Sequence, residues 1–520
     1  MLTRQRLLAL VATAAALALA ACGGDDSSSV AEDDPASLAP ADAPIYVQAT
    51  LRPKGKLKSD VEALASTISG LSDPAGRLIE EIDKGIGTES AQLRDPDFNF
   101  ADDIEPWLGE RVGFFADGFS EDPGAAIVQT TNAAAAQQAA EDGSDRSAEE
   151  RTYEGVDYFY DSEDEEATGV VGDFLVFGDE PAFKQVVDVS EGGDSIGEKS
   201  EFTDALDQAP EGTLLDAYAS LEKIADELRR ESGGNSQAVE AALGDTAGKS
   251  VIASLVPAAD SLELDIGTDA EVGTQLADLS SLIETFPADS FVALGIPNLG
   301  EIVDRSIDQL EDSGIQGLNR ESIDQQLSQA GLSIDEVTRA LGDLGIFAGG
   351  TDEASVQGAA VIASDDPDAA QNLISKLTAV TGLAQLSGDP SIQPAPVGNG
   401  ISITDPAELG RQPLIVTTEG DRIAIGYGEE ATRQALDQGA GATLGSDPTY
   451  QQAIKALGGD GVSGYVSMPD VFRLAESLGA LADPEYRQAK PYLDTLSYTV
   501  FGGGEQGDFQ NSKIVVGVER

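Results

Sequence analysis

Alternating apolar and polar positions mark several short segments of the chain as strands that bury one face. In residues 45–51 (IYVQATL), apolar side chains fall at every second position. Residues 57–71 instead place them three or four apart, the spacing of an amphipathic helix. The segments FFADGF and AAIVQTT follow each other closely enough to pair as antiparallel strands. The pattern predicts an α+β fold, in which each domain is a mainly antiparallel sheet covered by helices on one face.

Several sequence blocks occur twice, in the same order, along the chain. The clearest pairs are PADAPIYVQATL from Pro40 with PADSFVALGI from Pro287, LGERVGFFA from Leu108 with LGDLGIFAG from Leu341, GDFLVFGDEPAFKQVVD from Gly172 with GDRIAIGYGEEATRQALD from Gly420, and AYASLEKI from Ala217 with GYVSMPDV from Gly464. Chance similarity rarely preserves both the blocks and their order. The sequence therefore predicts two tandem copies of one domain, over residues 38–272 and 287–520, joined by a linker helix over 273–286.

The first 21 residues have the pattern of a signal peptide. Basic residues precede an uncharged run over 7–21, which ends in Leu19-Ala20-Ala21-Cys22. This run is shorter than the roughly 20 residues of a spanning helix, which makes a transmembrane anchor the weaker interpretation. Small residues before a cysteine are typical of a lipoprotein cleavage site, so we expect recognition of Leu19, Ala20 and Ala21 by a signal peptidase. An ordinary secretory signal that happens to contain a cysteine is the alternative.

Cys22 is the only cysteine in the chain, so it has no intrachain partner. Lipid on this residue would attach the protein to the outer face of a membrane, and two acyl groups hold stably where one does not. Residues 22–37 are rich in Gly, Ser and Asp, which predicts an acidic, flexible tether. We therefore expect an extracytoplasmic protein, at the cell surface or in the periplasm, whose membrane partner is reached through Cys22.

The charge and composition exclude several classes of function. The formal net charge of −62 repels nucleic acid, so no nucleic-acid partner is expected. The chain has no histidine, which rules out Ser-His-Asp and Cys-His catalysis and removes the commonest metal ligand. We expect no cofactor and no tightly held metal, and only oxygen-ligand metals such as calcium stay plausible.

Ser220 and Lys223 form the one spacing that could support nucleophilic catalysis. In S-x-x-K the serine and lysine lie one helical turn apart, where the lysine can act as the base. The alternative is a helix that begins after a capping serine, with Lys223 in solvent. No S-D-N or K-T-G partner occurs, and Asp470 stands at the position of Lys223 in the second copy. The helix cap is the favoured interpretation.

Other matches to known motifs lack their structural context. Residues 193–197 (GDSIG) fit G-x-S-x-G, but they follow a predicted helix rather than a strand. Asp95, Asp97 and Asn99 imitate an EF-hand loop, yet Phe100 occupies the position that requires glycine. Residues 161–166 (DSEDEE) could bind calcium weakly, although a charged strand tip is more often simply solvated. We predict no catalytic residue.

At its duplicated blocks, PADAPIYVQATLRPKG, LGERVGFFA and GDFLVFGDEPAFKQVVD, the chain resembles the actinobacterial secreted proteins grouped as domain-of-unknown-function family 3352. The resemblance implies a duplicated envelope protein and supplies no catalytic residues. The favoured function is a non-enzymatic, lipid-anchored envelope protein that binds an unidentified partner or ligand. A carrier of a lipid or another apolar molecule is the first alternative, and a Ser-Lys hydrolase is the second.

Overall fold

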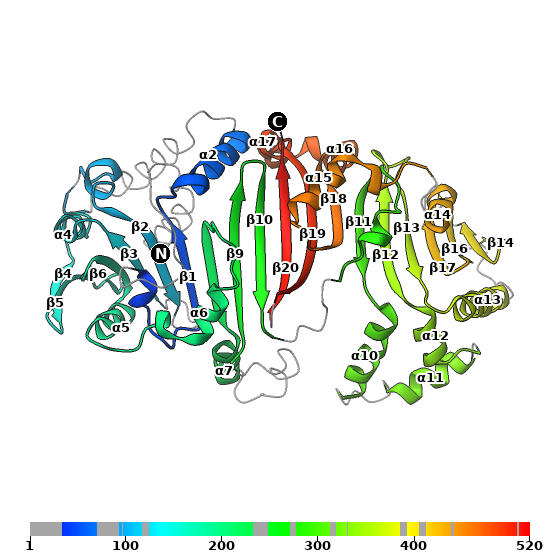
Figure 1. Cartoon of the computed structure of the whole chain (residues 1–520), viewed down its shortest axis with the longest axis horizontal. Helices are drawn as coiled ribbons and strands as arrows, with labels where there is room; N and C mark the ends of the chain where they lie inside the picture. The colour runs from blue at the N-terminus through cyan, green and yellow to red at the C-terminus, as the bar shows by residue number, and fades with distance from the viewer. Residues whose placement is uncertain are drawn as a thin grey trace. The chain divides into compact units, whose positions relative to one another are not determined.

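The protein has an α+β fold built on antiparallel sheet (Figure 1). The computed structural model describes residues 34–69, 93–95, 97–116, 124–231, 248–270, 277–312, 319–329, 331–384, 393–404, 412–437, 441–506 and 509–519. Leu19, Ala20, Ala21 and Cys22 lie outside these ranges, so the signal peptide and the lipid anchor stay predictions. The chain forms two compact units: unit 1 contains Met1–Gly273 and Glu505–Lys513, and unit 2 contains Thr274–Gly504 and Ile514–Glu519.

Unit 1 is an antiparallel sheet with the strand order β4-β5-β6-β7-β3-β2-β1-β8-β9-β10. Its strands are β1 (Ile45–Thr50), β2 (Leu108–Ala116), β3 (Ala125–Thr130), β4 (Glu149–Tyr153), β5 (Val156–Asp161), β6 (Glu166–Val171), β7 (Phe174–Asp179), β8 (Leu215–Ser220), β9 (Ser250–Ala258) and β10 (Ser261–Thr268). Its helices are η1 (Pro35–Ser37), α2 (Gly55–Ser69), η2 (Phe100–Ile104), α4 (Ala133–Asp142), α5 (Glu180–Ser190), η3 (Ile196–Glu198), α6 (Ser200–Leu206) and α7 (Leu221–Glu231).

Unit 2 has the strand order β14-β15-β16-β17-β13-β12-β11-β18-β19, and β19 also pairs with β20. The strands are β11 (Ser290–Ile296), β12 (Asp343–Gly349), β13 (Gln357–Ala363), β14 (Gln393–Val397), β15 (Gly400–Thr404), β16 (Leu414–Glu419), β17 (Arg422–Tyr427), β18 (Gly461–Ser467), β19 (Leu496–Gln506) and β20 (Phe509–Val518). The end of β19 and the first part of β20 fall within Glu505–Lys513, which belongs to unit 1. The helices are α9 (Ser280–Ile283), α10 (Leu299–Asp312), α11 (Arg320–Gln329), α12 (Ile334–Ala340), α13 (Pro367–Ala384), α14 (Glu429–Leu436), η5 (Leu444–Ser446), α15 (Pro448–Ala456), α16 (Met468–Ser477), η6 (Ala480–Ala482) and α17 (Pro484–Leu493). From β11 to β19, each strand has the same neighbours within its unit as the strand ten places earlier.

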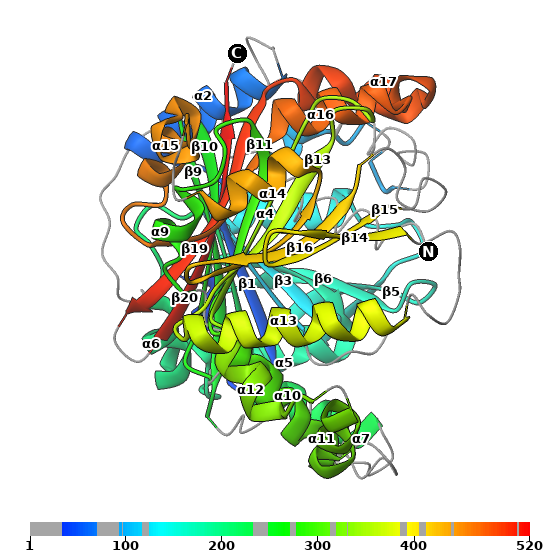
Figure 2. The ribbon, with the colours of Figure 1, turned by 90° about the vertical axis from the view of Figure 1, so that its right-hand side faces the viewer.

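Helices cover both faces of each sheet, so the prediction of a single covered face is wrong. In β3, Ile127 belongs to the core cluster that includes Val186 of α5, while the adjacent Val128 belongs to a second cluster with Ala136 of α4. Unit 2 repeats the arrangement, with α13 and α14 beside strands β16 and β17 (Figure 2). Central strands such as β3 are apolar at consecutive positions, because both of their faces must be buried.

The packed part of unit 1 begins earlier than the predicted end of the tether. Ala36 is fully buried in the core of unit 1. The Asp34 carboxylate accepts a hydrogen bond from the Ala36 N–H at 3.0 Å and pairs with Arg111 of β2. Residues 34–37 are therefore part of the folded unit. The expected tether is correspondingly shorter, because a small Pro-Ala-Ser turn is apolar enough to be buried.

The expected linker over 273–286 also contributes to a core. Where the structure describes this segment, it contains the short helix α9, and Leu282, Ile283 and Phe286 are buried in the main cluster of unit 2. The Phe286 ring lies 5.1 Å from the ring of Phe347 in β12. The apolar residues that suggested a connecting helix thus fill the interior of unit 2.

The repeated Leu-Gly pair marks a close approach between neighbouring strands. A Cβ atom on Gly342 would lie 1.9 Å from the Ala363 carbonyl oxygen, and one on Gly109 would lie 2.5 Å from the Gln129 carbonyl oxygen. Neither position has room for a side chain, because the facing atoms belong to backbone. The recurrence of this pair in the sequence therefore has a packing cause.

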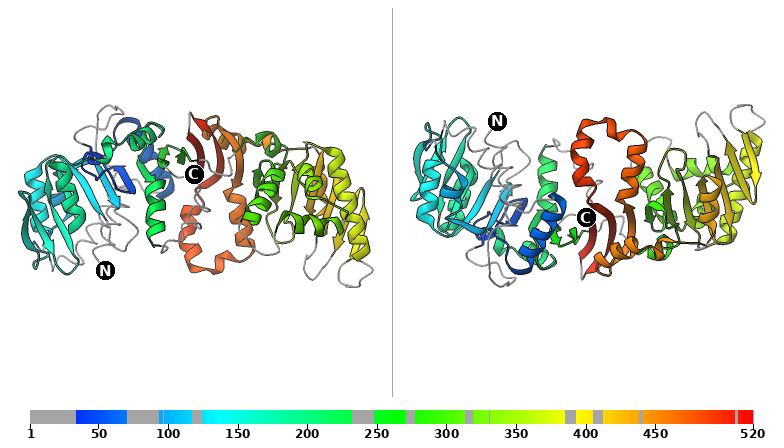
Figure 3. Two further views of the ribbon diagram at one scale, coloured as in Figure 1. Left: turned by 90° about the horizontal axis from the view of Figure 1, so that it is seen from below. Right: turned by 90° about the horizontal axis from the view of Figure 1, so that it is seen from above.

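Helices α16 and α17 lie next to one another in unit 2 (Figure 3). Lys490 of α17 pairs with Glu476 of α16, and η6 connects the two helices. None of these three elements has a buried residue.

None of the helices in the described ranges has the length and apolarity needed to span a bilayer.

Candidate binding pocket in unit 1

A pocket of about 520 Å³ opens in unit 1 where β1 begins, beside β8 and the starts of α6 and α7. Its size lies within the range of roughly 300–1,000 Å³ that is usual for small-molecule sites. Tyr218 of β8 lines the pocket and is nine-tenths buried, and its ring meets that of Phe202 edge-on at 5.3 Å. Burial, with Glu201 and Asp269 nearby, raises the pKa of Tyr218 to about 12. Its hydroxyl is therefore protonated at neutral pH.

Three lysines line this pocket: Lys199, Lys223 and Lys249. The chain contains only twelve lysines and carries a net charge of −62, so three at one pocket is a marked local excess. Lys199 Nζ lies 3.9 Å from Asp194, and Lys249 Nζ lies 3.8 Å from Asp269, both near the limit of an ion pair. Within the part of the chain that the structure describes, Lys223 has no ion-pair partner.

Four carboxylates also line the pocket: Asp42, Asp194, Glu201 and Glu222. All four belong to exposed residues, and Glu222 accepts a hydrogen bond from the Gly248 N–H at 2.8 Å. Since exposed acidic residues occur throughout this chain, they distinguish the pocket less than the lysines do. Their effect is to oppose ligands that carry many negative charges.

Ser220 is the capping residue of α7, as the favoured sequence interpretation states. Its hydroxyl oxygen accepts a hydrogen bond from the backbone N–H of Lys223 at 3.4 Å. No histidine can act as a base to activate this hydroxyl, because the chain has none. The structure thus places Ser220 and Lys223 together in a pocket, with the serine engaged by the helix rather than aligned by a base.

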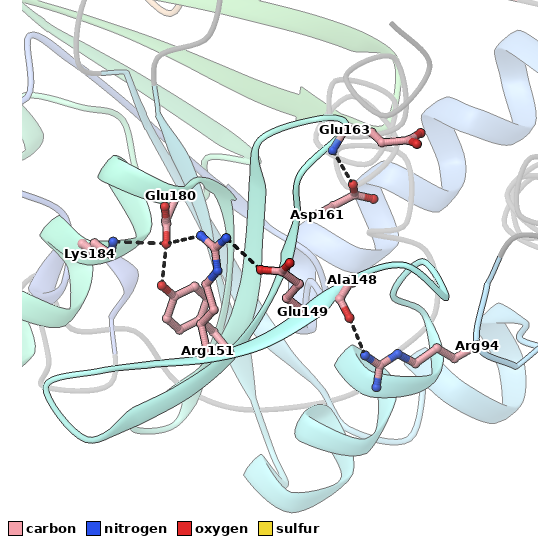
Figure 4. Close-up of polar contacts among 9 residues, drawn as sticks. Arg94, Ala148, Glu149, Arg151, Asp161, Glu163, Glu180 and Lys184 are labelled. Atoms are coloured by element: carbon pink, nitrogen blue, oxygen red, sulfur yellow. Dashed lines mark hydrogen bonds and ion pairs between the residues drawn. The ribbon is translucent and has the colours of Figure 1, made fainter.

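The other sequence motifs form turns and caps. Ser195 of the GDSIG segment is buried and donates its N–H to Glu198 Oε2 at 3.4 Å. The Asp95 carboxylate accepts from the Asp97 N–H at 2.9 Å, and the Asp161 carboxylate accepts from the Glu163 N–H at 2.8 Å (Figure 4). Among the described residues, no group of three or more Asp, Glu, His or Cys could hold a metal ion.

A second charged cluster in unit 1 ties α5 to the outer strands. Glu180 accepts hydrogen bonds from Arg151 of β4 at 3.0 Å and from Tyr158 of β5 at 2.6 Å, and it pairs with Lys184 at 3.1 Å (Figure 4). Burial alone would raise the pKa of Glu180, but hydrogen bonds from Tyr158, Lys184 and Arg151 lower it below its usual value. Because each of these groups already has its partner, the cluster is structural.

Replacing Glu180 by glutamine should lower the free energy of unfolding of unit 1 by about 1 kcal/mol at pH 7. The folded-state pKa of Glu180 is depressed, so its stabilisation is present above the unfolded-state pKa and is lost as the pH falls through the folded-state value. The difference from the parent should therefore shrink once the pH falls below the unfolded-state pKa of about 4.3, and it should vanish below the lowered folded-state pKa. Urea titrations monitored by Trp107, the only tryptophan and a buried residue of unit 1, measure this.

Glu149→Gln is the matched control, because Glu149 binds the same Arg151 but is 62% exposed. We expect it to change the unfolding free energy by less than about 0.5 kcal/mol. An equal effect of the two substitutions would contradict a special role for Glu180.

At the position in unit 2 that corresponds to the pocket, aspartates stand in place of two of the three lysines. The correspondence follows from the strand pairing, in which Tyr46 faces Tyr218 and Ala293 faces Tyr465. Lys199, which directly precedes α6, then matches Asp447, which directly precedes α15. Lys223 is the third residue of α7 and matches Asp470, the third residue of α16. The lysine-lined site is thus confined to unit 1 in the described residues.

A family model described as "Protein of unknown function (DUF3352)" matches residues 7–499. The chain belongs to the DUF3352 family. This confirms the resemblance noted in the sequence, and the match spans both units of this DUF3352 protein. That description assigns the family no function.

No curated protein matches this DUF3352 protein in sequence. Two solved structures are similar to it. "Structure of crystal form IV of TP0453" shares 11% identity at a TM-score of 0.25 and covers 47% of this chain and 81% of its own. "Structure of crystal form III of TP0453" shares 10% identity at a TM-score of 0.18 and covers 78% and 97%. At these TM-scores they support no argument about fold or function.

Sequence reasoning singled out Ser220 and Lys223 but missed Lys199 and Lys249. The two missed lysines come from distant segments, which the pairing of β1, β8 and β9 brings together. A signal for Lys199 was present, since Asp447 stands at the matching position of unit 2. Lys249 shows no comparable local signal.

Proposed function

We propose that this DUF3352 protein is a non-enzymatic binding protein of the bacterial cell envelope, anchored by lipid on Cys22, whose ligand binds in the unit 1 pocket. The observation that carries the proposal is the lysine-lined pocket of about 520 Å³ in an otherwise strongly acidic chain. A non-enzymatic role is supported by Ser220, whose oxygen caps α7. Anchoring is supported by the lipoprotein pattern before Cys22.

We further propose that the two units are copies of one domain. Strands β1 to β9 and β11 to β19 have corresponding neighbours, and in both units a bridge joins the Pro-Ala-Asp segment to the residue before a 3₁₀ turn, Pro40 to Ser195 and Pro287 to Thr443. Because the matching sites differ in charge, the copies would have diverged in ligand binding. This supports one binding unit and one that serves another purpose.

An apolar ligand fits the described pockets less well than a polar one. The second pocket, in unit 2, is lined by charged and polar residues that include Asp289, Glu430, Arg433 and Asp437. Burying an apolar chain against such groups would leave charges without water or partners, which is costly. The lipid-carrier alternative therefore has no specific support in these two sites.

Binding can be tested by releasing small molecules from protein purified from its own envelope. Denaturation of the parent should release about one ligand molecule per chain, detectable by mass spectrometry. Ala41→Trp fills the unit 1 pocket and should abolish the release, whereas Ala288→Trp, at the corresponding position in unit 2, should not. These alanines are matched, since each N–H donates to a backbone oxygen at 3.1 Å, of Asp194 and Ala442 respectively. Equal release from both variants would contradict the proposed site.

Cys22→Ser tests the anchor separately. Without the thiol, no lipid can be attached, so the variant should leave the membrane fraction or accumulate as an unprocessed precursor. Membrane fractionation followed by intact-mass measurement checks both outcomes. Retention of the processed variant in the membrane, at the level of the parent, would exclude lipid on Cys22 as the anchor.

A further inference from the structure

Two of the three lysines of the unit 1 pocket, Lys199 and Lys223, stand at helix starts, where local helix chemistry disfavours lysine. Lys199 occupies the capping position of α6 and makes no side-chain cap there. In unit 2 the matching Asp447 caps α15 by accepting a hydrogen bond from the Tyr450 N–H at 2.9 Å. Short acceptors such as Asp suit this position because they satisfy a free backbone N–H, which lysine cannot do. Helix α6 of unit 1 therefore lacks the side-chain cap that α15 of unit 2 has.

Lys223 repeats this arrangement at the start of α7. It lies in the first helical turn, where the helix dipole favours negative charge and disfavours positive charge. The matching Asp470 has the favourable sign, accepts a hydrogen bond from Ser467, and pairs with Arg473 at 2.6 Å. Lysines at the start of α2 differ from Lys223, because Lys56 pairs with Asp60 and Lys58 with Glu62.

A residue that breaks a local rule without a local compensation points to a function. Because Lys199 and Lys223 stand at unfavourable helix positions, we propose that the unit 1 pocket holds a phosphate group of a small ligand between Lys199, Lys223 and Lys249. This inference rests on the binding role proposed above. Phosphate is favoured over carboxylate because a phosphate group presents three strong acceptor oxygens to the three lysines that line the pocket, whereas a carboxylate presents two.

Other features of the pocket fit this ligand. The N-terminus of α7 adds a positive electrostatic contribution next to Lys223. The protonated hydroxyl of Tyr218 is a hydrogen-bond donor on the pocket wall. Lys199 and Lys249 hold their present carboxylate partners only at 3.9 and 3.8 Å, so little is lost when they turn to a ligand. The four carboxylates limit the ligand to a small number of negative charges.

The proposal is tested by thermal unfolding of the purified chain, followed through Trp107. Inorganic phosphate and sn-glycerol 3-phosphate are the phosphate probes, with acetate and glycerol as carboxylate and neutral controls at constant ionic strength. At ten times its dissociation constant, a bound probe should raise the melting temperature of unit 1 by about 3–6 °C. A response to glycerol 3-phosphate alone would indicate a phospholipid-type headgroup as the source, and a response to both would include free phosphate.

The double variant Lys199→Asp/Lys223→Asp introduces the residues of unit 2 and separates binding from folding. Each change restores favourable helix chemistry, so the ligand-free variant should melt about 2–4 °C higher than the parent while losing the response to phosphate. Lys56→Asp/Lys58→Asp makes the same change in charge on α2, at the other end of the sheet from α7 (Figure 1), and should keep the response.

Three results would overturn the proposal. The melting temperature of the parent could fail to rise with either phosphate probe, or it could rise equally in the parent and in Lys199→Asp/Lys223→Asp. The third is a rise with acetate as large as that with phosphate. If the envelope-purified protein still released a ligand that Ala41→Trp abolished, the binding role would stand and only the phosphate assignment would fail.

Discussion

Replacing Phe183 by alanine is expected to lower the free energy of unfolding of unit 1 by about 3–5 kcal/mol. Phe183 lies on α5 and is completely buried in the main core of the unit. Its ring lies 4.8 Å from that of Tyr158 in β5, so truncation removes contacts with the outer strands as well as the central ones. The cavity left behind adds to the lost transfer energy, because close-packed surroundings relax only in part.

Equilibrium unfolding in urea measures this effect, with Trp107 as the reporter for unit 1. Val189→Ala on the same helix is the control, since Val189 is only partly buried, and it should cost less than about 1.5 kcal/mol. A Phe183→Ala variant within 1 kcal/mol of the parent would mean that α5 does not pack as described.

The second large effect is expected at Phe286, in the segment that the sequence suggested as a linker. Phe286→Ala should lower the free energy of unfolding of unit 2 by about 3–5 kcal/mol. The side chain is 1% exposed, and a Cβ on Gly345 would lie only 2.4 Å from its ring, so the ring is tightly enclosed. A linker residue would tolerate the change.

Hydrogen exchange of peptides from β11 and β12, analysed by mass spectrometry in increasing urea, reports on unit 2 directly. Ser281→Ala is a suitable control, because Ser281 is exposed on the same short helix α9. We expect its exchange profile to match that of the parent. If Phe286→Ala also matched the parent, the segment would be a connector and not part of the core.

Much of the local structure could be predicted from apolar spacing. The alternation over 45–51 corresponds to β1 (Ile45–Thr50), and the helical spacing over 57–71 corresponds to α2 (Gly55–Ser69). The expected pairing of neighbouring strands is present between β2 and β3. These elements are encoded locally, by the period of their own side chains.

The predictions that were wrong concern features that depend on contacts between segments far apart in the sequence. The prediction of one covered face missed the second helix layer. The consecutive buried residues of β3 are typical of a strand that lies between two layers of helices. The buried Ala36 and Phe286 were assigned to a tether and a linker, because their partners lie elsewhere in the sequence. The pocket is the clearest case, since Lys199 and Lys249 meet only through the fold.

A crystal structure of the protein purified from its own envelope would test the central claim most directly. The account predicts electron density for a small phosphate-bearing molecule in the unit 1 pocket, within hydrogen-bonding distance of Lys199, Lys223 and Lys249. At the matching place in unit 2, beside Asp447 and Asp470, no such density should appear. A unit 1 pocket that contains only water, or a ligand held solely by unit 2, would contradict the account.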